Sequence, residues 1–390
     1  MKILYVTTIS LTMNSFFKPH IEMLVGEGHE VDIACNYVEL PLDKLYIDLG
    51  CTFHQIDFSR TPLSPDNIKA YRQLNNVIEN GGYDIVHCHT PNASVITRLV
   101  CRKFRKKNGL KVFYTAHGFH FYKGAPILNW LIYYPVEKLC SSFTDKLITI
   151  NKEDFELAKN KFKAKEVHYV PGVGIDLSRF ENIDVDRNTK RREIGVPEDA
   201  FLLLSVGELN DNKNHQIIIR ALAKIKNPHV HYAIAGLGSE HDRLLDLACE
   251  LGVSKQVHLL GYRNDVPELN LFADAFCFPS HREGLGVAAI EAMACGLPII
   301  TSNVHGINDY SIDGITGFKC SPDSVEGFST AINRLINDVE LRLAMRKYNL
   351  EAAKKFNIDS INYQMRQIYG IYLAEDFYVS TQNINSDSCV

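Results

Sequence analysis

The stretch AFCFPSHREGLGVAAIEAMACGLP, residues 275–298, contains the patterns of a strand, a turn and a helix in direct succession. Four apolar residues, Ala275–Phe278, form the strand pattern, and Pro279-Ser280 are turn residues. A helical pattern follows and is stopped by Gly296 and Pro298. Short apolar runs alternate with longer amphipathic stretches in the rest of the chain as well, which predicts an α/β protein with parallel sheets.

Two acids in this stretch, Glu283 and Glu291, stand eight positions apart with small or apolar residues between them. The glycines among these residues let a ligand approach the backbone, and the free N–H groups at a helix start suit a phosphate. Two carboxylates so placed can hold the hydroxyls at the two ends of a sugar nucleotide. For an arbitrary pair of acids, a capped helix with solvated carboxylates is the simpler interpretation.

The residues from Phe278 to Pro298 resemble the E-x7-E signature of family-4 retaining glycosyltransferases. This resemblance implies the GT-B fold, in which two Rossmann-like, doubly wound domains face each other across a cleft. In that family the first glutamate contacts the donor sugar and the second binds the ribose, roles that correspond to Glu283 and Glu291. The other residues expected to contact the donor here are Gly284, Leu285, Gly286 and Val287.

A length of 390 residues suits two domains, and the polar stretch 184–192 is interpreted as the end of the connection between them. We expect an acceptor-binding domain over residues 1–183 and a nucleotide-sugar-binding domain over residues 184–359. The resemblance implies that a C-terminal helix, residues 360–377, crosses back to the first domain, and residues 378–390 are predicted to be a polar tail. The residues expected on one face of that helix are Ile361, Met365, Ile368 and Tyr372.

Ligands of doubly wound sheets bind beyond the carboxyl ends of the strands, so the residues that follow each strand are the candidates. His117 follows a predicted strand, residues 112–116, and Gly118 leaves it room. On general grounds a histidine at this position is a structural residue. The resemblance instead implies a catalytic position for His117, beside the donor sugar and the acceptor.

The loop that contains His89 and Asn92 is similar to the family's His-x-Pro loop, which implies that both residues lie near the acceptor. We expect His87 and His89 to point to opposite faces of their strand, which disfavours a metal site made by this pair. No bound metal is expected as a cofactor, because the GT-B fold does not need one.

The loop after the predicted strand 201–206 departs from the family pattern. The family usually has Gly-Arg-Leu followed by a lysine, and the two cations bind the diphosphate. Lys213 fits the second cation, but Glu208 replaces the arginine, and a carboxylate repels a phosphate. We therefore expect Lys213, the helix start near Gly286 and Arg282 to supply the positive field.

Two further loops of the second domain are candidates, the first from the resemblance and the second from its position. The backbone around Arg263, which follows a predicted strand over residues 257–260, is expected to contact the nucleotide base. The run Ser302–Asp309 is expected to lie opposite the start of the helix and to close on a phosphate or the ribose.

The composition is typical of a globular enzyme and not of a nucleic-acid-binding or membrane-spanning protein. An apolar fraction of 46% and a charged fraction of 23% are normal for a globular enzyme, and a net charge of −4 gives no nucleic-acid signal. The ten scattered cysteines have no C-x-x-C spacing, and no apolar run approaches the length of a membrane span. We expect a cytoplasmic protein.

A basic stretch over residues 93–107 allows two interpretations. A solvated surface helix is one, and attachment to the anionic inner face of the plasma membrane is the other. The apolar residues 129–134 either add contact with that membrane or belong to the core. The basic residues of the stretch are Arg98, Arg102, Lys103, Arg105, Lys106 and Lys107.

The resemblance implies an enzyme that moves a hexosyl or N-acetylhexosaminyl group, with retention, from a nucleotide diphosphate sugar, with UDP as the expected nucleotide. The implied acceptor is a saccharide on a polyprenyl diphosphate carrier, and the implied process is the synthesis of capsule, exopolysaccharide or lipopolysaccharide. The alternatives are a UDP-sugar 2-epimerase of the same architecture and a non-catalytic nucleotide-sugar-binding protein, which Glu208 favours. A dinucleotide oxidoreductase is disfavoured because Thr8–Asn14 lacks G-x-G-x-x-G.

Overall fold

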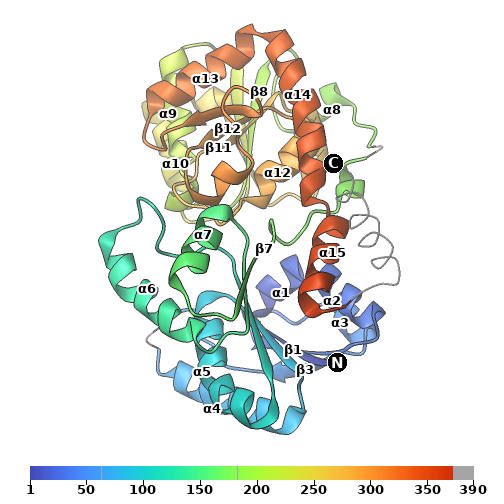
Figure 1. The fold of residues 1–390 in the computed structure, drawn as a ribbon. Coiled ribbons are helices and arrows are strands. Elements are labelled where there is room, and N and C mark those ends of the chain that lie inside the picture. Colours follow the sequence, from blue (N-terminus) through green and yellow to red (C-terminus); the bar gives the residue numbers. More distant parts are fainter. Residues whose placement is uncertain (63, 182, 372–390) are drawn as a thin grey trace, which may run out of the picture.

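The computed structural model describes residues 1–62, 64–181 and 183–371. The described chain forms two lobes, each built around one parallel sheet (Figure 1). The lower lobe in the figure contains the first half of the chain, and the upper lobe contains the second half. This architecture confirms the predicted α/β class with two Rossmann-like domains.

The first sheet has the strand order β3-β2-β1-β4-β5-β6-β7, and its described pairs are all parallel. Alternate side chains of β1 enter opposite layers: Ile3 and Tyr5 pack in one apolar cluster, and Leu4 and Val6 pack in the other. The strands are β1 (Lys2–Ile9), β2 (Glu30–Asn36), β3 (Thr52–Gln55), β4 (Ile85–His89), β5 (Lys111–Ala116), β6 (Lys146–Thr149) and β7 (Glu166–Tyr169). The helices are α1 (Ser10–Phe16), α2 (Lys18–Gly26), α3 (Lys44–Asp48), α4 (Asp66–Gly81), α5 (Pro91–Asn108), α6 (Ile127–Ser141) and α7 (Lys152–Lys161).

The second sheet has the order β10-β9-β8-β11-β12-β13 and is also parallel throughout its described pairs. Its strands are β8 (Phe201–Val206), β9 (Val230–Ala235), β10 (Val257–Gly261), β11 (Ala275–Phe278), β12 (Ile299–Ser302) and β13 (Gly317–Cys320). The α-helices are α8 (Arg187–Glu193), α9 (Gln216–Ile225), α10 (His241–Glu250), α11 (Val266–Phe272), α12 (Val287–Ala294), α13 (Val325–Asn337) and α14 (Val339–Ala353). The short 3₁₀ segments are η1 (Leu177–Phe180), η2 (Asp211–Lys213), η3 (Ser254–Gln256), η4 (His305–Asp309) and η5 (Lys354–Phe356).

The last described helix, α15 (Ile358–Tyr369), returns to the first domain and lies beside α2 (Figure 1). Ile361, Met365 and Ile368 are buried there in the same cluster as β1 side chains, and the Arg366 Nε–Glu27 Oε1 distance is 2.8 Å. The helix ends at Tyr369, before Gly370 in the left-handed region. Tyr372, which was expected on the buried face, and the predicted tail 378–390 lie outside the described residues.

Candidate active site

Three glycines from both domains bring loops at the carboxyl ends of β5, β11 and β12 into backbone contact. A Cβ atom built on Gly118 would lie 2.8 Å from Gly284 Cα, and one on Gly284 would lie 2.1 Å from the carbonyl oxygen of His117. One on Gly306 would lie 1.9 Å from the carbonyl oxygen of Gly284. Because only glycine lacks a Cβ, only glycine permits these approaches. We call Gly118, Gly284 and Gly306 the glycine junction.

Lys213 and Glu283 meet beside this junction. Lys213 Nζ lies 2.6 Å from Glu283 Oε1 and 4.9 Å from the centroid of the Phe278 ring. The lysine arrives from η2, after β8, and its stem passes Gly207, where an added Cβ would be 3.3 Å from Lys213 Cε. The two side chains are 21% and 13% exposed, so a ligand can still reach them.

Glu291 lies eight residues after Glu283, inside α12. Burial raises the pKa of Glu291, and Arg179, whose Nη1 is 4.0 Å from Glu291 Oε1, opposes this rise. The helix begins after Gly286, which has a φ of +90° and supplies no side-chain cap. The first N–H groups of α12 are therefore not capped by a side chain at position 286, and an anion can accept hydrogen bonds from them.

His117 and His89 form a hydrogen-bonded pair on the first-domain side. His117 Nε2 lies 3.1 Å from His89 Nδ1, and His89 is almost fully buried. Burial lowers the pKa of His117 to about 4 and holds the pKa of His89 well below its usual value. Both rings are therefore neutral near pH 7, and His117 acts as a hydrogen-bonding group rather than a cation.

The expectation that His87 and His89 point to opposite faces of β4 is wrong. Residues two positions apart on a strand share a face, and the two ring centroids are 4.2 Å apart. His87 Nδ1 lies 2.5 Å from the hydroxyl of Tyr369, and His87 Nε2 lies 2.8 Å from Thr115 Oγ1. Both nitrogens of His87 are thus engaged, which leaves none for a metal ion.

Other predicted residues have their side chains occupied by the protein. Asn92 Nδ2 donates to the carbonyl oxygens of Ser59 and Arg60 at 3.1 and 2.6 Å. Leu285 is 4% exposed and packs in the core of the second domain. At these positions a ligand can use the main chain or, for Asn92, the remaining amide oxygen.

Arg263 is held in an ion-pair cluster. Its Nε lies 2.7 Å from Asp265 Oδ1, and its Nη2 lies 2.8 Å from Glu193 Oε1. The cluster ties the loop after β10 to α8, and Lys190 Nζ joins it at 3.0 Å from Asp265 Oδ2. The guanidinium is thus used within the protein, and a nucleotide could contact only the backbone here.

Polar contacts that the sequence did not reveal join the two domains around the glycine junction. His305 Nε2 lies 3.0 Å from Asp154 Oδ1, and both side chains are buried. Asn151 Nδ2 donates to the carbonyl oxygen of Gly284 at 3.0 Å. Asp309 Oδ2 accepts from the Lys152 N–H at 2.9 Å. Asn151 lies two residues after the end of β6, so its position near a strand end was the available signal.

Comparisons with known proteins agree with this arrangement. The family model described as "Glycosyl transferase 4-like" matches residues 2–151, and the one described as "Glycosyl transferases group 1" matches residues 186–352. The putative glycosyltransferase EpsD of Bacillus subtilis is 37% identical over 380 residues, which cover 96% of this chain and 98% of that protein. The chain belongs to the family-4 glycosyltransferases. It is therefore an enzyme, a hexosyltransferase with the GT-B fold.

More distant proteins share the whole architecture of this glycosyltransferase. The UDP-Gal:alpha-D-GlcNAc-diphosphoundecaprenol alpha-1,3-galactosyltransferase of Escherichia coli is 26% identical, with 86% of this chain and 88% of that protein covered. The solved structure of Anabaena Alr3699/HepE in complex with UDP superposes with a TM-score of 0.76 at 19% identity. That superposition covers 95% of this chain and 100% of the other.

Although Glu208 replaces the arginine of the usual family pattern, the site still contains cations. Glu208 is exposed, and its Oε2 accepts a hydrogen bond from Asn210 Nδ2 at 2.9 Å. Arg282 is half-buried and has no ion pair within the described residues. Burial lowers the pKa of His120 to about 4, and the positive charge of Arg282 adds to this effect, so Arg282 lies close to the first domain.

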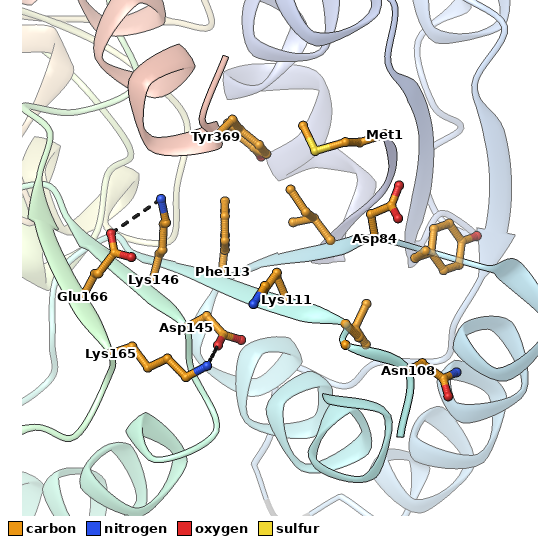
Figure 2. A pocket seen from close by; sticks show the side chains of 14 residues that line it. Met1, Asp84, Asn108, Lys111, Phe113, Asp145, Lys146, Lys165, Glu166 and Tyr369 are labelled. Carbon is orange, nitrogen blue, oxygen red and sulfur yellow. Dashed lines mark ion pairs between the residues drawn. The ribbon is translucent and has the colours of Figure 1, made fainter. Parts of the chain in front are cut away.

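A separate cavity of about 410 Å³ lies at the amino ends of β4–β7, and Figure 2 shows the side chains that line it. The glycine junction is at the carboxyl ends of the strands, so the two lie at opposite ends of the first sheet. Four of the charged side chains of the cavity form ion pairs with each other: Lys165 lies 2.7 Å from Asp145, and Lys146 lies 3.5 Å from Glu166. The predicted site residues do not line this cavity. The candidate site is therefore assigned from the carboxyl ends of the strands and not from the size of a cavity.

Proposed function

We propose that this glycosyltransferase transfers a hexosyl or N-acetylhexosaminyl group from a UDP-sugar, with retention, to a saccharide carried on polyprenyl diphosphate. The observation that carries the proposal is the Lys213–Glu283 pair beside the uncapped start of α12, with Glu291 further along the same helix. The name of the Escherichia coli relative, which includes a UDP-sugar donor and a diphosphoundecaprenol acceptor, supports the two substrates. The product is proposed to be a repeat of a surface polysaccharide.

The diphosphate is proposed to lie between Lys213, Arg282 and the first N–H groups of α12. A bound diphosphate competes with Glu283 for the ammonium group of Lys213. Glu283 then turns to hydroxyls of the donor sugar, which orients the anomeric carbon. The buried carboxylate of Glu291 accepts hydrogen bonds from the ribose hydroxyls at the other end of the nucleotide.

The transfer is proposed to proceed on one face of the sugar. The bond between the anomeric carbon and the diphosphate oxygen breaks, and the acceptor oxygen forms its bond from the same side. The acceptor proton passes to the departing phosphate oxygen, so no protein carboxylate acts as a nucleophile. Lys213, Arg282 and the backbone N–H groups hold the charge that develops on the diphosphate, and neutral His117 hydrogen-bonds the sugar.

The test is an assay with purified protein, UDP-sugars and a polyprenyl-diphosphate saccharide. We expect UDP release that depends on the acceptor, and a product with the same anomeric configuration as the donor by NMR. Isomerised donor formed without acceptor would instead identify a 2-epimerase. UDP binding without UDP release, with every donor and acceptor pair, would identify a nucleotide-sugar-binding protein without this activity.

A further inference from the structure

The outer side of α6 is apolar and exposed. The exposed fractions of its apolar side chains run from 41% to 74%, and Lys138, seven residues after the exposed Leu131, stands on the same side. Leu128, Ile132 and Leu139 follow each other at spacings of four and seven residues, so they share one helical face. The exposed apolar residues are Ile127, Leu128, Leu131, Ile132, Val136 and Leu139.

The opposite side of α6 is already packed on the first domain, so the exposed face is a second apolar face. Trp130 and Tyr134 contact the core, and the buried Arg98–Glu137 ion pair, at 2.9 Å, ties α6 to α5. A helix that is apolar on all sides is normally covered by protein or lipid on all sides. The described residues cover only one side of α6.

The charges around this face are positive. The acid of α6, Glu137, is buried with Arg98, and Lys138 is exposed. Arg102, from α5, lies 5.6 Å from the centroid of the Phe143 ring, just beyond the end of α6. The last turn of α5 adds Lys106 and Lys107, and neither of these lysines forms an ion pair within the described chain. The surface therefore matches an anionic partner.

The first turn of α6 is connected to the loop that carries His117. Asn129 Nδ2 donates to the carbonyl oxygen of His120 at 2.9 Å, and the Trp130 ring lies 5.6 Å from the Phe121 ring. Figure 1 shows α6 at the outer flank of the lower lobe, on the side that faces the upper lobe. Whatever α6 binds is thus held beside the first-domain wall of the active site.

We propose that α6 and the basic end of α5 attach this enzyme to an anionic lipid surface, with the apolar face of α6 in the interface. The proposal rests on the proposed function, because a lipid-carried acceptor requires the site to work at a membrane. No helix in the described part of the chain is long and apolar enough to cross a bilayer, so the attachment is to one leaflet. A second copy of the chain fits less well, because a two-fold contact through α6 would bring Lys138 and Arg102 of both copies together.

Sedimentation of the full chain with lipid vesicles, without nucleotide, tests this attachment. We expect binding to vesicles that contain phosphatidylglycerol and much weaker binding to phosphatidylcholine alone. The triple variant Leu128→Gln, Leu131→Gln, Leu139→Gln is expected to lower the partition coefficient at least about tenfold, because each change removes an apolar side chain from the interface. Lys106→Glu with Lys107→Glu is expected to lower it on anionic vesicles only.

A matched control is Val339→Gln with Leu343→Gln on α14, two side chains that are each 54% exposed in the second domain. We expect this control to bind vesicles like the wild type. Equal binding by the wild type and the α6 variant, equal loss in the control, or no binding by the wild type would overturn the proposal. A wild-type dimer that the α6 variant converts to a monomer, with vesicle binding unchanged, would assign the face to a second copy and overturn it too.

A thermal-shift titration with UDP on the same proteins separates this proposal from the proposed function. We expect UDP to raise the melting temperature of the wild type and of the α6 variant equally, which also shows that the variant is folded. If UDP shifts none of the proteins while the α6 variant still loses vesicle binding, the proposed donor is wrong and the lipid surface stands.

Discussion

The ends of β10 and β11, two strands of the same sheet, both carry a cation close to carboxylates. They differ in whether a cation remains without a carboxylate partner. After β10, Arg263 is bound by Asp265 and Glu193, and its guanidinium has acids on both sides. After β11, Glu283 pairs with a single cation, Lys213, which comes from the segment after β8, while Arg282 has no ion pair among the described residues. The charge of Arg263 is therefore balanced by acids of the protein. At the end of β11, the positive charge of Arg282 remains available to an anionic ligand.

The two strand ends also differ in their backbone. The loop after β11 contains Gly284 of the glycine junction and leads to the uncapped start of α12, so main-chain N–H groups can reach a ligand. The loop after β10 is fastened to α8 by ion pairs. We therefore expect similar residue types after two strands of one sheet to serve different purposes: ligand binding at β11 and fold stability at β10.

If the end of β11 is the active one, Glu283→Gln is expected to have the largest effect. The amide cannot accept hydrogen bonds from sugar hydroxyls as a carboxylate does, and Lys213 loses its partner. We expect turnover to fall about 10²–10³-fold, the range for one preorganised electrostatic group, measured as acceptor-dependent UDP release. Glu208→Gln, which alters an exposed acid in the loop after β8, is the control and is expected to stay near the wild-type rate. Near-normal turnover of Glu283→Gln would remove Glu283 from the mechanism.

Gly284→Ala is expected to have the next largest effect. Its Cβ would lie 2.1 Å from the carbonyl oxygen of His117, so the two domains must move apart. A displacement of about 1 Å at an active site can lower the rate about 10²-fold, and we expect a loss of that order in UDP release. The control is Gly26→Ala on α2, where an added Cβ meets nothing within 4 Å. Equal activity of both variants would show that the contact at the glycine junction is not needed.

Glu291→Ala is expected to act on nucleotide binding. Loss of the ribose contact should raise the Kd for UDP about tenfold, since hydrogen bonds to a charged group contribute about 1.5–3 kcal/mol. Burial raises the pKa of Glu291, so its carboxylate is protonated at a higher pH than an exposed glutamate. We therefore expect the UDP affinity of the wild type to weaken as pH falls through that pKa. The difference in Kd for UDP between the wild type and Glu291→Gln is then expected to become smaller. Calorimetry over a pH series measures this, and an identical Kd for the wild type and Glu291→Ala would exclude the ribose contact.

Arg282→Ala is expected to raise the Kd for UDP several-fold, because one of two cations near the diphosphate is lost while Lys213 stays. Glu208→Arg, which restores the arginine of the usual family pattern, is expected to recover part of this loss in the double variant. Calorimetry at two salt concentrations measures the effect, since a phosphate contact weakens as salt screens it. Unchanged affinity in Arg282→Ala would assign the diphosphate charge to Lys213 and the backbone alone.

Arg263→Ala is expected to have the smallest effect on the reaction. Asp265 and Glu193 would lose their partner, so we expect a free energy of unfolding lower by about 1 kcal/mol in urea, as for a partly exposed ion-pair network. The Kd for UDP should change less than about twofold, well under the 1.4 kcal/mol of a tenfold effect. A strong loss of UDP affinity with unchanged stability would reverse the assignment of the two strand ends.

The fold was predictable because its signals are local. The strand pattern Ala275–Phe278 is β11 in the structure, and the helical pattern after it is α12. The helix α6 has no such signal, since it is apolar on both faces and contains Pro135, so neither a polar face nor an unbroken helical pattern marks it. Only its packing on the first domain distinguishes the inner face from the outer one.

The candidate site was predictable in part. Lys213 and Glu283 both follow strands, so the rule for parallel sheets placed them at one edge, and the structure brings them to 2.6 Å. The commitment of Arg263 to Asp265 and Glu193 depends on side-chain geometry that spacing does not reveal. The His305–Asp154 contact joins residues 151 positions apart, and no local pattern encodes such a pair.

The hydroxyl of Tyr369 has a consequence for how the enzyme is made. It lies 2.5 Å from His87, 282 positions earlier in the chain, and the His87 ring is in contact with His89, which is hydrogen-bonded to His117. During synthesis the ribosome completes the first sheet long before it reaches α15. The hydrogen bond to His87 can thus form only after the last helix has emerged, and a nascent chain cut short before Tyr369 carries the sheet without it.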